Sequence, residues 1–293
     1  MGGGTYTVSS FADYSISSGK SYNRLTGRVS GQSFHSSHLK EVLNPKGHIR
    51  ECCNSTEHPN TIPVILALDV TGSMGSACKE TAEALGVIME ELYKKYKDIE
   101  ICVMGVGDFE CDDAPLQVSQ FESDVRVAQQ LDQIWMEHGG GGNGYESYTA
   151  PWLFGLYRTK LDAYDQQGRK GIIITMGDEP LNPDLPSHTV KDYLGKVDGG
   201  EEFVFDTPKL YELASKKFDI YHLAVDAPDS SYSSHEHRIK ETFPPILGDH
   251  FKVTTIDSLA SNIVACIDDS LSRSGAPAPA PKAPTAADGE ITW

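Results

Sequence analysis

The fold of this 293-residue chain is decided by the stretch Thr61-Ile62-Pro63-Val64-Ile65-Leu66-Ala67-Leu68-Asp69-Val70-Thr71-Gly72-Ser73-Met74. Its apolar, β-prone first part predicts a buried strand that ends at Asp69. One acidic and two hydroxyl side chains then alternate through Asp69, Thr71 and Ser73. The stretch therefore predicts a strand that delivers three oxygen ligands at its carboxyl end.

Short apolar runs of this kind recur along the chain, and patterns with helical periodicity separate them. We expect strands at 61–69, 99–107, 171–176, 218–225 and 251–256. We expect helices at 78–97, 123–137, 148–159, 189–196, 208–217, 235–241 and 257–273. Alternation of strands and helices predicts an α/β fold: a Rossmann-like three-layer sandwich with a central, mainly parallel sheet flanked by helices.

Composition divides the chain into three parts. Residues 1–60 are rich in Ser, Gly, Asn and His with little periodicity, and the first fifty carry six basic but only two acidic residues. Residues 274–289 form a Pro/Ala-rich linker before the terminal Trp293. We therefore expect an irregular basic extension at 1–60, the α/β domain at 61–273 and a Pro/Ala-rich tail at 274–293.

Charge and cysteine usage exclude several classes of protein. The 25 basic and 42 acidic residues give a formal charge of −17, which disfavours nucleic acid and anionic membrane surfaces as partners. No apolar run approaches the ~20 residues of a membrane span. The six cysteines form no disulfide framework, and the N-terminus does not resemble a signal peptide. We expect a cytoplasmic protein.

Ligands of parallel sheets bind at the carboxyl ends of the strands. Besides Asp69, the carboxylate of Asp178 follows a strand there, and a glycine-rich loop at 139–149 carries oxygen side chains. Carboxylates and hydroxyls without His or Cys suit Mg²⁺, Mn²⁺ or Ca²⁺ better than zinc. Two carboxylates around a divalent ion leave open coordination positions, so we expect such a site to take an anion from elsewhere.

Other motifs fit less well. An EF-hand starting at Asp69 would need glycine where Met74 stands, and a phosphate-binding loop would need a Gly-Lys-Ser/Thr end. A further cluster could in principle bind zinc, and it consists of His48, Cys52, Cys53 and His58. Its two cysteines are adjacent, which is a poor arrangement for zinc ligands. Neither a nucleophile elbow nor a His-Glu-x-x-His helix occurs in the sequence. We do not expect an enzyme.

The run Asp69-Val70-Thr71-Gly72-Ser73-Met74 after a hydrophobic strand resembles the first motif of von Willebrand factor type A (VWA) domains, over about 61–273. The resemblance implies a metal-ion-dependent adhesion site, with Asp69, Thr71 and Ser73 as first ligands and Asp178 as the third-motif aspartate. The family's middle motif departs from its usual form here. Its ligand is expected among Glu146 and Ser147, with Asn143 and Thr149 as alternatives.

The leading functional hypothesis is a protein-interaction module that binds a partner's Asp or Glu through Mg²⁺, or through Mn²⁺ or Ca²⁺. One alternative is a metal-assisted hydrolase or phosphatase, for which Glu179 or Glu146 would supply the base. Another is a structural assembly protein that docks through its terminal arms, 1–50 and 274–293, with a purely stabilising metal site.

Overall fold

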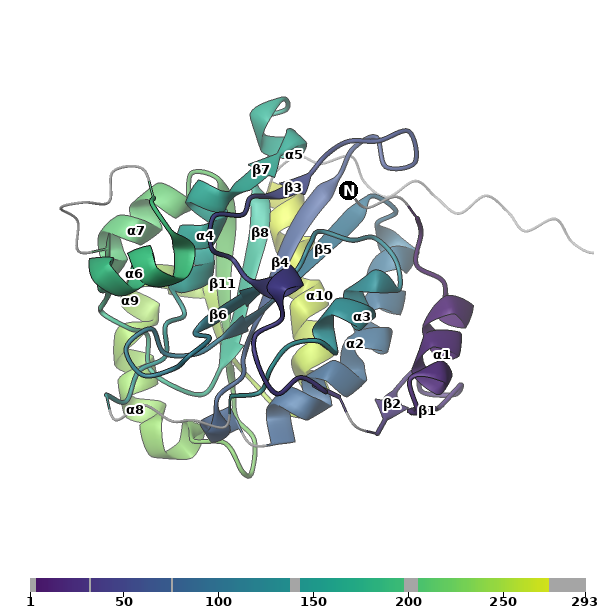
Figure 1. The fold of residues 1–293 in the computed structure, drawn as a ribbon, viewed down its shortest axis with the longest axis horizontal. Coiled ribbons are helices and arrows are strands. Elements are labelled where there is room, and N and C mark those ends of the chain that lie inside the picture. Colours follow the sequence, from purple (N-terminus) through teal and green to yellow (C-terminus); the bar gives the residue numbers. More distant parts are fainter. Residues whose placement is uncertain (1–3, 32, 75, 138–142, 198–204, 274–293) are drawn as a thin grey trace, which may run out of the picture.

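The computed structural model describes residues 4–31, 33–74, 76–137, 143–197 and 205–273. Its centre is a six-stranded sheet with the strand order β12-β11-β8-β4-β5-β6 (Figure 1). In chain order these strands are β4 Ile62–Asp69, β5 Ile99–Val106, β6 Leu116–Val118, β8 Gly171–Gly177, β11 Phe218–Val225 and β12 Phe251–Thr254. Neighbouring strands are parallel except that β6 runs antiparallel to β5. The expected mixed α/β fold with a mainly parallel central sheet is confirmed.

Helices flank the sheet on both faces. On one face, α2 (Ser76–Lys95) packs against α10 (Ile256–Arg273), with α3 (Arg126–Leu131) beside them (Figure 1). The other face is covered by α4 (Ala150–Arg158) and α7 (Thr207–Ala214), which pack against each other. Smaller helices add to that second face: α6 Ser187–Leu194, α8 Tyr232–Thr242 and α9 Pro244–Leu247.

The central strand β4 shows how the sequence produces two cores. Side chains along a strand point alternately to opposite faces. Accordingly, Val64, Leu66 and Leu68 lie in the core beneath α2 and α10, whereas Ile65 and Ala67 lie in the core beneath α4. Strand β4 is apolar up to its last residue, Asp69, and it is buried on both faces, as its sequence predicts.

The remaining elements are short. They are β1 Ser21–Tyr22, β2 Val29–Ser30, η1 Glu41–Leu43, β3 Arg50–Cys52, η2 Gly72–Met74, β7 Thr159–Leu161, α5 Asp162–Asp165, β9 Asp184–Leu185, β10 Phe205–Asp206 and η3 Gly248–His250. Within the described part of the chain, no helix is long and apolar enough to span a membrane. The expected Pro/Ala-rich tail, 274–293, lies outside the described residues.

The N-terminal segment is more ordered than the expected irregular extension. Helix α1 (Val8–Ser17) begins at a capping box in which the Thr7 hydroxyl accepts a hydrogen bond from the Ser10 backbone N–H. Its Phe11 ring packs against α2, where a Cβ atom added at Gly86 would lie 2.3 Å from the ring. The absent side chain at Gly86 therefore lets α1 lie closely on α2, a relation between distant residues that no local pattern reveals.

Candidate metal centre

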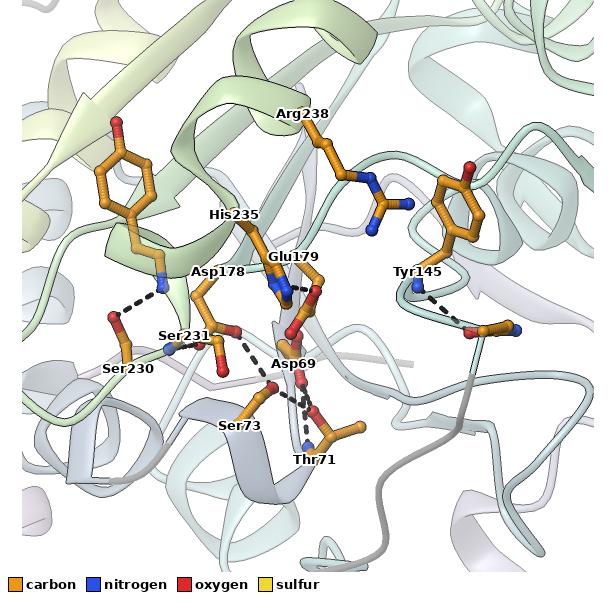
Figure 2. Close-up of polar contacts among 12 residues, drawn as sticks. Asp69, Thr71, Ser73, Tyr145, Asp178, Glu179, Ser230, Ser231, His235 and Arg238 are labelled. Atoms are coloured by element: carbon orange, nitrogen blue, oxygen red, sulfur yellow. Dashed lines mark hydrogen bonds and ion pairs between the residues drawn. The ribbon is translucent and has the colours of Figure 1, made fainter.

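The turn after β4 gathers three of the predicted ligands. Asp69 is fully buried, and its Oδ1 accepts hydrogen bonds from the backbone N–H of Thr71 at 2.9 Å and from the Thr71 hydroxyl at 2.6 Å. The following 3₁₀ turn, η2, places the Ser73 hydroxyl 2.9 Å from Thr71 Oγ1 (Figure 2). The Asp-x-Thr-x-Ser spacing thus brings three oxygen side chains to one side of the turn.

The fourth predicted ligand arrives from the neighbouring strand. β4 pairs with β8 in a register that sets Leu68 opposite Met176, so Asp178 emerges from the same sheet edge as Asp69. The Ser73 hydroxyl donates to Asp178 Oδ1 at 3.2 Å, and the backbone N–H of Ser231 donates to Asp178 Oδ2 at 2.5 Å. The sheet topology therefore joins Asp69, Thr71, Ser73 and Asp178 into one chain of hydrogen-bonded oxygens.

A tyrosine that the sequence analysis missed holds the other side of Asp69. The fully buried Tyr148 hydroxyl donates to Asp69 Oδ2 at 2.6 Å and accepts from the backbone N–H of Glu179 at 3.2 Å. A Cβ atom added at Gly177 would lie only 2.0 Å from that hydroxyl oxygen. The glycine before Asp178 is a sequence signal of such a close approach, although it does not say which residue approaches.

The four side chains of this oxygen chain have fewer hydrogen atoms than they have contacts with one another. Three contacts join Asp69, Thr71, Ser73 and Asp178, but only the two hydroxyls supply hydrogens. When both carboxylates are ionised, one oxygen–oxygen contact has no hydrogen in it. A proton on a carboxylate or a cation among the oxygens removes that deficit.

The spacing of the oxygens fits a small divalent cation. Mg²⁺ binds six oxygens at about 2.0–2.1 Å, so adjacent ligands of an octahedron lie about 2.9 Å apart. The three contacts in the chain measure 2.6, 2.9 and 3.2 Å. Hydrogen bonds have the same lengths, so the spacing is compatible with a hard cation and the chemistry of the donors is what suits one.

The electrostatics of the two aspartates point the same way. Burial, and next the charge of Asp178, raises the pKa of Asp69 to about 7. Burial also raises the pKa of Asp178, opposed mainly by the hydrogen bond from the Ser231 backbone. Two buried carboxylates that share one polar chain are costly to ionise together, and a cation would offset this cost.

The middle-loop candidates are placed differently from one another. The Ser147 hydroxyl accepts a hydrogen bond from the Phe109 backbone N–H at 2.9 Å, and the Thr149 hydroxyl accepts from the Asn182 side chain at 2.7 Å. Asn143 caps its own turn by accepting from the Tyr145 backbone N–H at 3.1 Å. Among the described residues, no hydrogen bond joins these three to the oxygen chain of Asp69.

Glu146 is the middle-loop candidate that carries a carboxyl group, and burial disfavours the ionised form of that group. Its side chain is buried, and Oε2 has no hydrogen-bond partner within the described ranges. Burial, followed by repulsion from Asp69, raises its pKa to about 11. Of the four loop candidates, Glu146 is therefore the one that a nearby cation would stabilise most.

Helix α8 closes the other side of the site. Glu179 follows Asp178, and its Oε2 lies 2.5 Å from His235 Nδ1 on α8 (Figure 2). Burial, and next the charge of Asp178, raises the pKa of Glu179 to about 8.

In the part of the chain that the structure describes, no group of three or more His, Cys, Asp or Glu side chains is arranged to hold a metal ion. The zinc cluster weighed from the sequence is not assembled there, and the oxygen chain is of another kind because half of its ligands are hydroxyls.

Comparison with known proteins adds little. No family model matches the chain, and no curated protein matches it. Two structures of the pilus adhesin SpaC from Lactobacillus rhamnosus GG are similar over 78% of this chain, with 12% and 13% sequence identity and TM-scores of 0.45 and 0.48. The matched region spans 31% and 32% of those chains. Both neighbours are pilus adhesins, but a likeness this distant does not carry their function to this chain.

Proposed function

We propose that this chain is a Rossmann-like module of the VWA type that binds a divalent cation, Mg²⁺ above all, and uses it to bind a partner's carboxylate. The observation that carries the proposal is the oxygen chain between Asp69 and Asp178, which has three contacts, two hydrogens and a spacing compatible with an octahedral ion's ligands. Asp69, Thr71, Ser73 and Asp178 would hold the ion, and Glu146 is the middle-loop candidate for a further ligand. When bound, the cation would neutralise the two aspartates and supply open coordination positions.

The charge balance explains why the partner would be acidic. Two aspartates neutralise a divalent ion, and the hydroxyls of Thr71 and Ser73 add no charge. The chain as a whole carries −17, so its surface repels a carboxylate on average. A cation at this edge of the sheet reverses that repulsion locally, and a partner's Asp or Glu would complete the coordination.

The two alternatives from the sequence gain no comparable support. A hydrolase would need a free base beside the ion. Glu179 is engaged by His235, and burial raises the pKa of Glu146 to about 11, which keeps that carboxyl group protonated. A docking arm at 1–50 is free only in part, because α1 buries Phe11 against its own body while Leu25 is exposed. The second arm, 274–293, lies outside the described residues. The binding module is therefore the function that the described contacts favour.

Calorimetric titration of Mg²⁺, Mn²⁺ and Ca²⁺ into the purified chain tests the proposal. We expect saturable binding of at least one ion in the wild type and its loss in Asp69→Ala and Asp178→Ala. Asp226→Asn is a matched control, because this exposed aspartate follows β11 at the same sheet edge but lies outside the oxygen chain. Equal binding by Asp178→Ala and the wild type would contradict the proposed site.

Partner binding is tested by pull-down from a cell extract in Mg²⁺ and in EDTA. We expect the complex to form in Mg²⁺ and to be lost in EDTA and in Asp69→Ala. A complex that survives EDTA would show that the cation does not hold the partner.

A further inference from the structure

One arginine beside the candidate metal centre forms no close ion pair with a carboxylate of the described residues. On α8, Lys240 pairs with Glu236, His237 pairs with Glu241 at 3.1 Å and His235 pairs with Glu179 at 2.5 Å. Among the described residues, no carboxylate lies within ion-pair distance of Arg238, the other charged side chain of that helix. Burial raises the pKa of Glu179, and the positive charge of Arg238 nevertheless acts to lower it, so the guanidinium lies close enough to the site to act on it.

The middle loop holds this guanidinium in place. The Arg238 guanidinium carbon lies 4.6 Å from the centre of the Tyr145 ring. Its Nη1 would be 2.8 Å from a Cβ atom added at Gly144, which adopts the left-handed φ of +71°. Stacking on a ring face leaves the N–H groups at the edge of the guanidinium able to donate hydrogen bonds.

The position of Arg238 relates it to the metal centre. Arg238 and His235 are three residues apart, so they share one face of α8. His235 reaches Glu179, next to the ligand Asp178, while Arg238 points toward Tyr145 of the middle loop (Figure 2). The guanidinium therefore stands at the rim of the candidate site, half-buried and fixed between two elements that border it.

We propose that Arg238 is a second anchor for the partner, which presents two acidic side chains on one segment. One carboxylate completes the cation's coordination and the other accepts paired hydrogen bonds from Arg238. This inference rests on the proposed function and adds the class of partner: an acidic protein segment with two carboxylates.

Short synthetic peptides test the inference without the natural partner. Five acetylated and amidated Gly/Ser peptides are titrated by NMR in Mg²⁺: one with a single Glu, and four with a second Glu one to four residues after the first. Wild type is compared with Arg238→Gln and Arg238→Lys. Lys240→Gln removes a paired charge from the same helix, and Tyr145→Phe keeps the ring beneath the guanidinium.

We expect at least one spacing of the two Glu residues to bind the wild type roughly threefold to fivefold more tightly than the single Glu. Arg238→Gln should abolish that gain and leave the single-Glu affinity unchanged, while Arg238→Lys should keep part of it. Both control variants should keep the full gain. If Arg238 only stabilised the fold through its contact with the Tyr145 ring, replacing it would not change how the affinity depends on the second Glu of the peptide.

Two different results would overturn the inference. If single-Glu peptides bind in Mg²⁺ but no spacing binds more tightly, or the gain persists in Arg238→Gln, Arg238 is not an anchor and the metal-dependent function stands. If no peptide shows Mg²⁺-dependent binding, the proposed function itself is wrong and the inference falls with it.

Discussion

Replacing Tyr148 by Phe isolates the hydroxyl that orients Asp69. The ring would remain packed beside His222 and Phe243, with centroid separations of 4.9 and 5.9 Å. The variant loses the 2.6 Å hydrogen bond to Asp69 Oδ2 and leaves the Glu179 backbone N–H without its acceptor. The change therefore removes one oxygen atom whose two contacts both belong to the candidate site.

The size of the effect follows from these two contacts. Partners that orient a metal's ligands change metal affinity by about 10–100-fold when they are removed. An unsatisfied buried donor costs about 1–3 kcal/mol of stability. We therefore predict that Tyr148→Phe lowers Mg²⁺ affinity by about 10–100-fold and lowers the free energy of unfolding by about 1–3 kcal/mol, while the protein remains folded.

Calorimetric titration with Mg²⁺ and denaturant unfolding measure the two effects separately. Tyr221→Phe is the matched control, because that hydroxyl also donates to an aspartate, Asp269, at 2.8 Å but belongs to the contact between β11 and α10. The control should lose some stability and no metal affinity. Wild-type affinity in a folded Tyr148→Phe protein, or an equal loss in Tyr221→Phe, would refute the role given to Tyr148.

Three further predictions concern single side chains. Thr71→Asp adds a charge to the oxygen chain, so calorimetry should show metal held at least as well, while pull-down should show weaker partner binding; unchanged partner binding would contradict the charge argument. Gly177→Ala forces a Cβ atom to within 2.0 Å of the Tyr148 hydroxyl, so it should destabilise the fold by about 1–3 kcal/mol and weaken Mg²⁺ binding, and a variant with neither defect would refute this packing. Burial raises the pKa of Glu100 to about 7, above about 4.5 for the unfolded chain, so stability should fall as pH rises from about 4.5 to 7. Glu100→Gln should remove that slope and stabilise the protein above pH 7 by at most about 3 kcal/mol, and an unchanged unfolding curve across this pH range would contradict the assignment.

Five of the six strands of the sheet were predictable because each is a short, mainly apolar run rich in β-prone residues. The predicted range 218–225 coincides with β11, and the predicted end at Asp69 coincides with the end of β4. Strand β6 was missed because its three residues, Leu116–Val118, are too few to form a pattern inside an acidic stretch. Helix α1 was missed because its place depends on contact with α2 and not on strong local periodicity.

The candidate site was predictable where it depends on local spacing and strand ends. The turn at Asp69 sets three oxygens by sequence alone, and Asp178 follows from the rule that parallel strands end at one edge. Tyr148 and the Ser231 backbone depend on how α4 and α8 pack over that edge, which leaves no spacing signature in the sequence. The place of Arg238 against Tyr145 likewise depends on how α8 packs beside the middle loop, which no local pattern shows.

Crystals of the protein soaked in Mn²⁺, measured near the manganese absorption edge, test the central claim most directly. We predict one anomalous peak bordered by the side-chain oxygens of Asp69, Thr71, Ser73 and Asp178, and its disappearance in Asp69→Ala. A wild-type map with no peak at this edge of the sheet, or with a peak held by other residues, would contradict it.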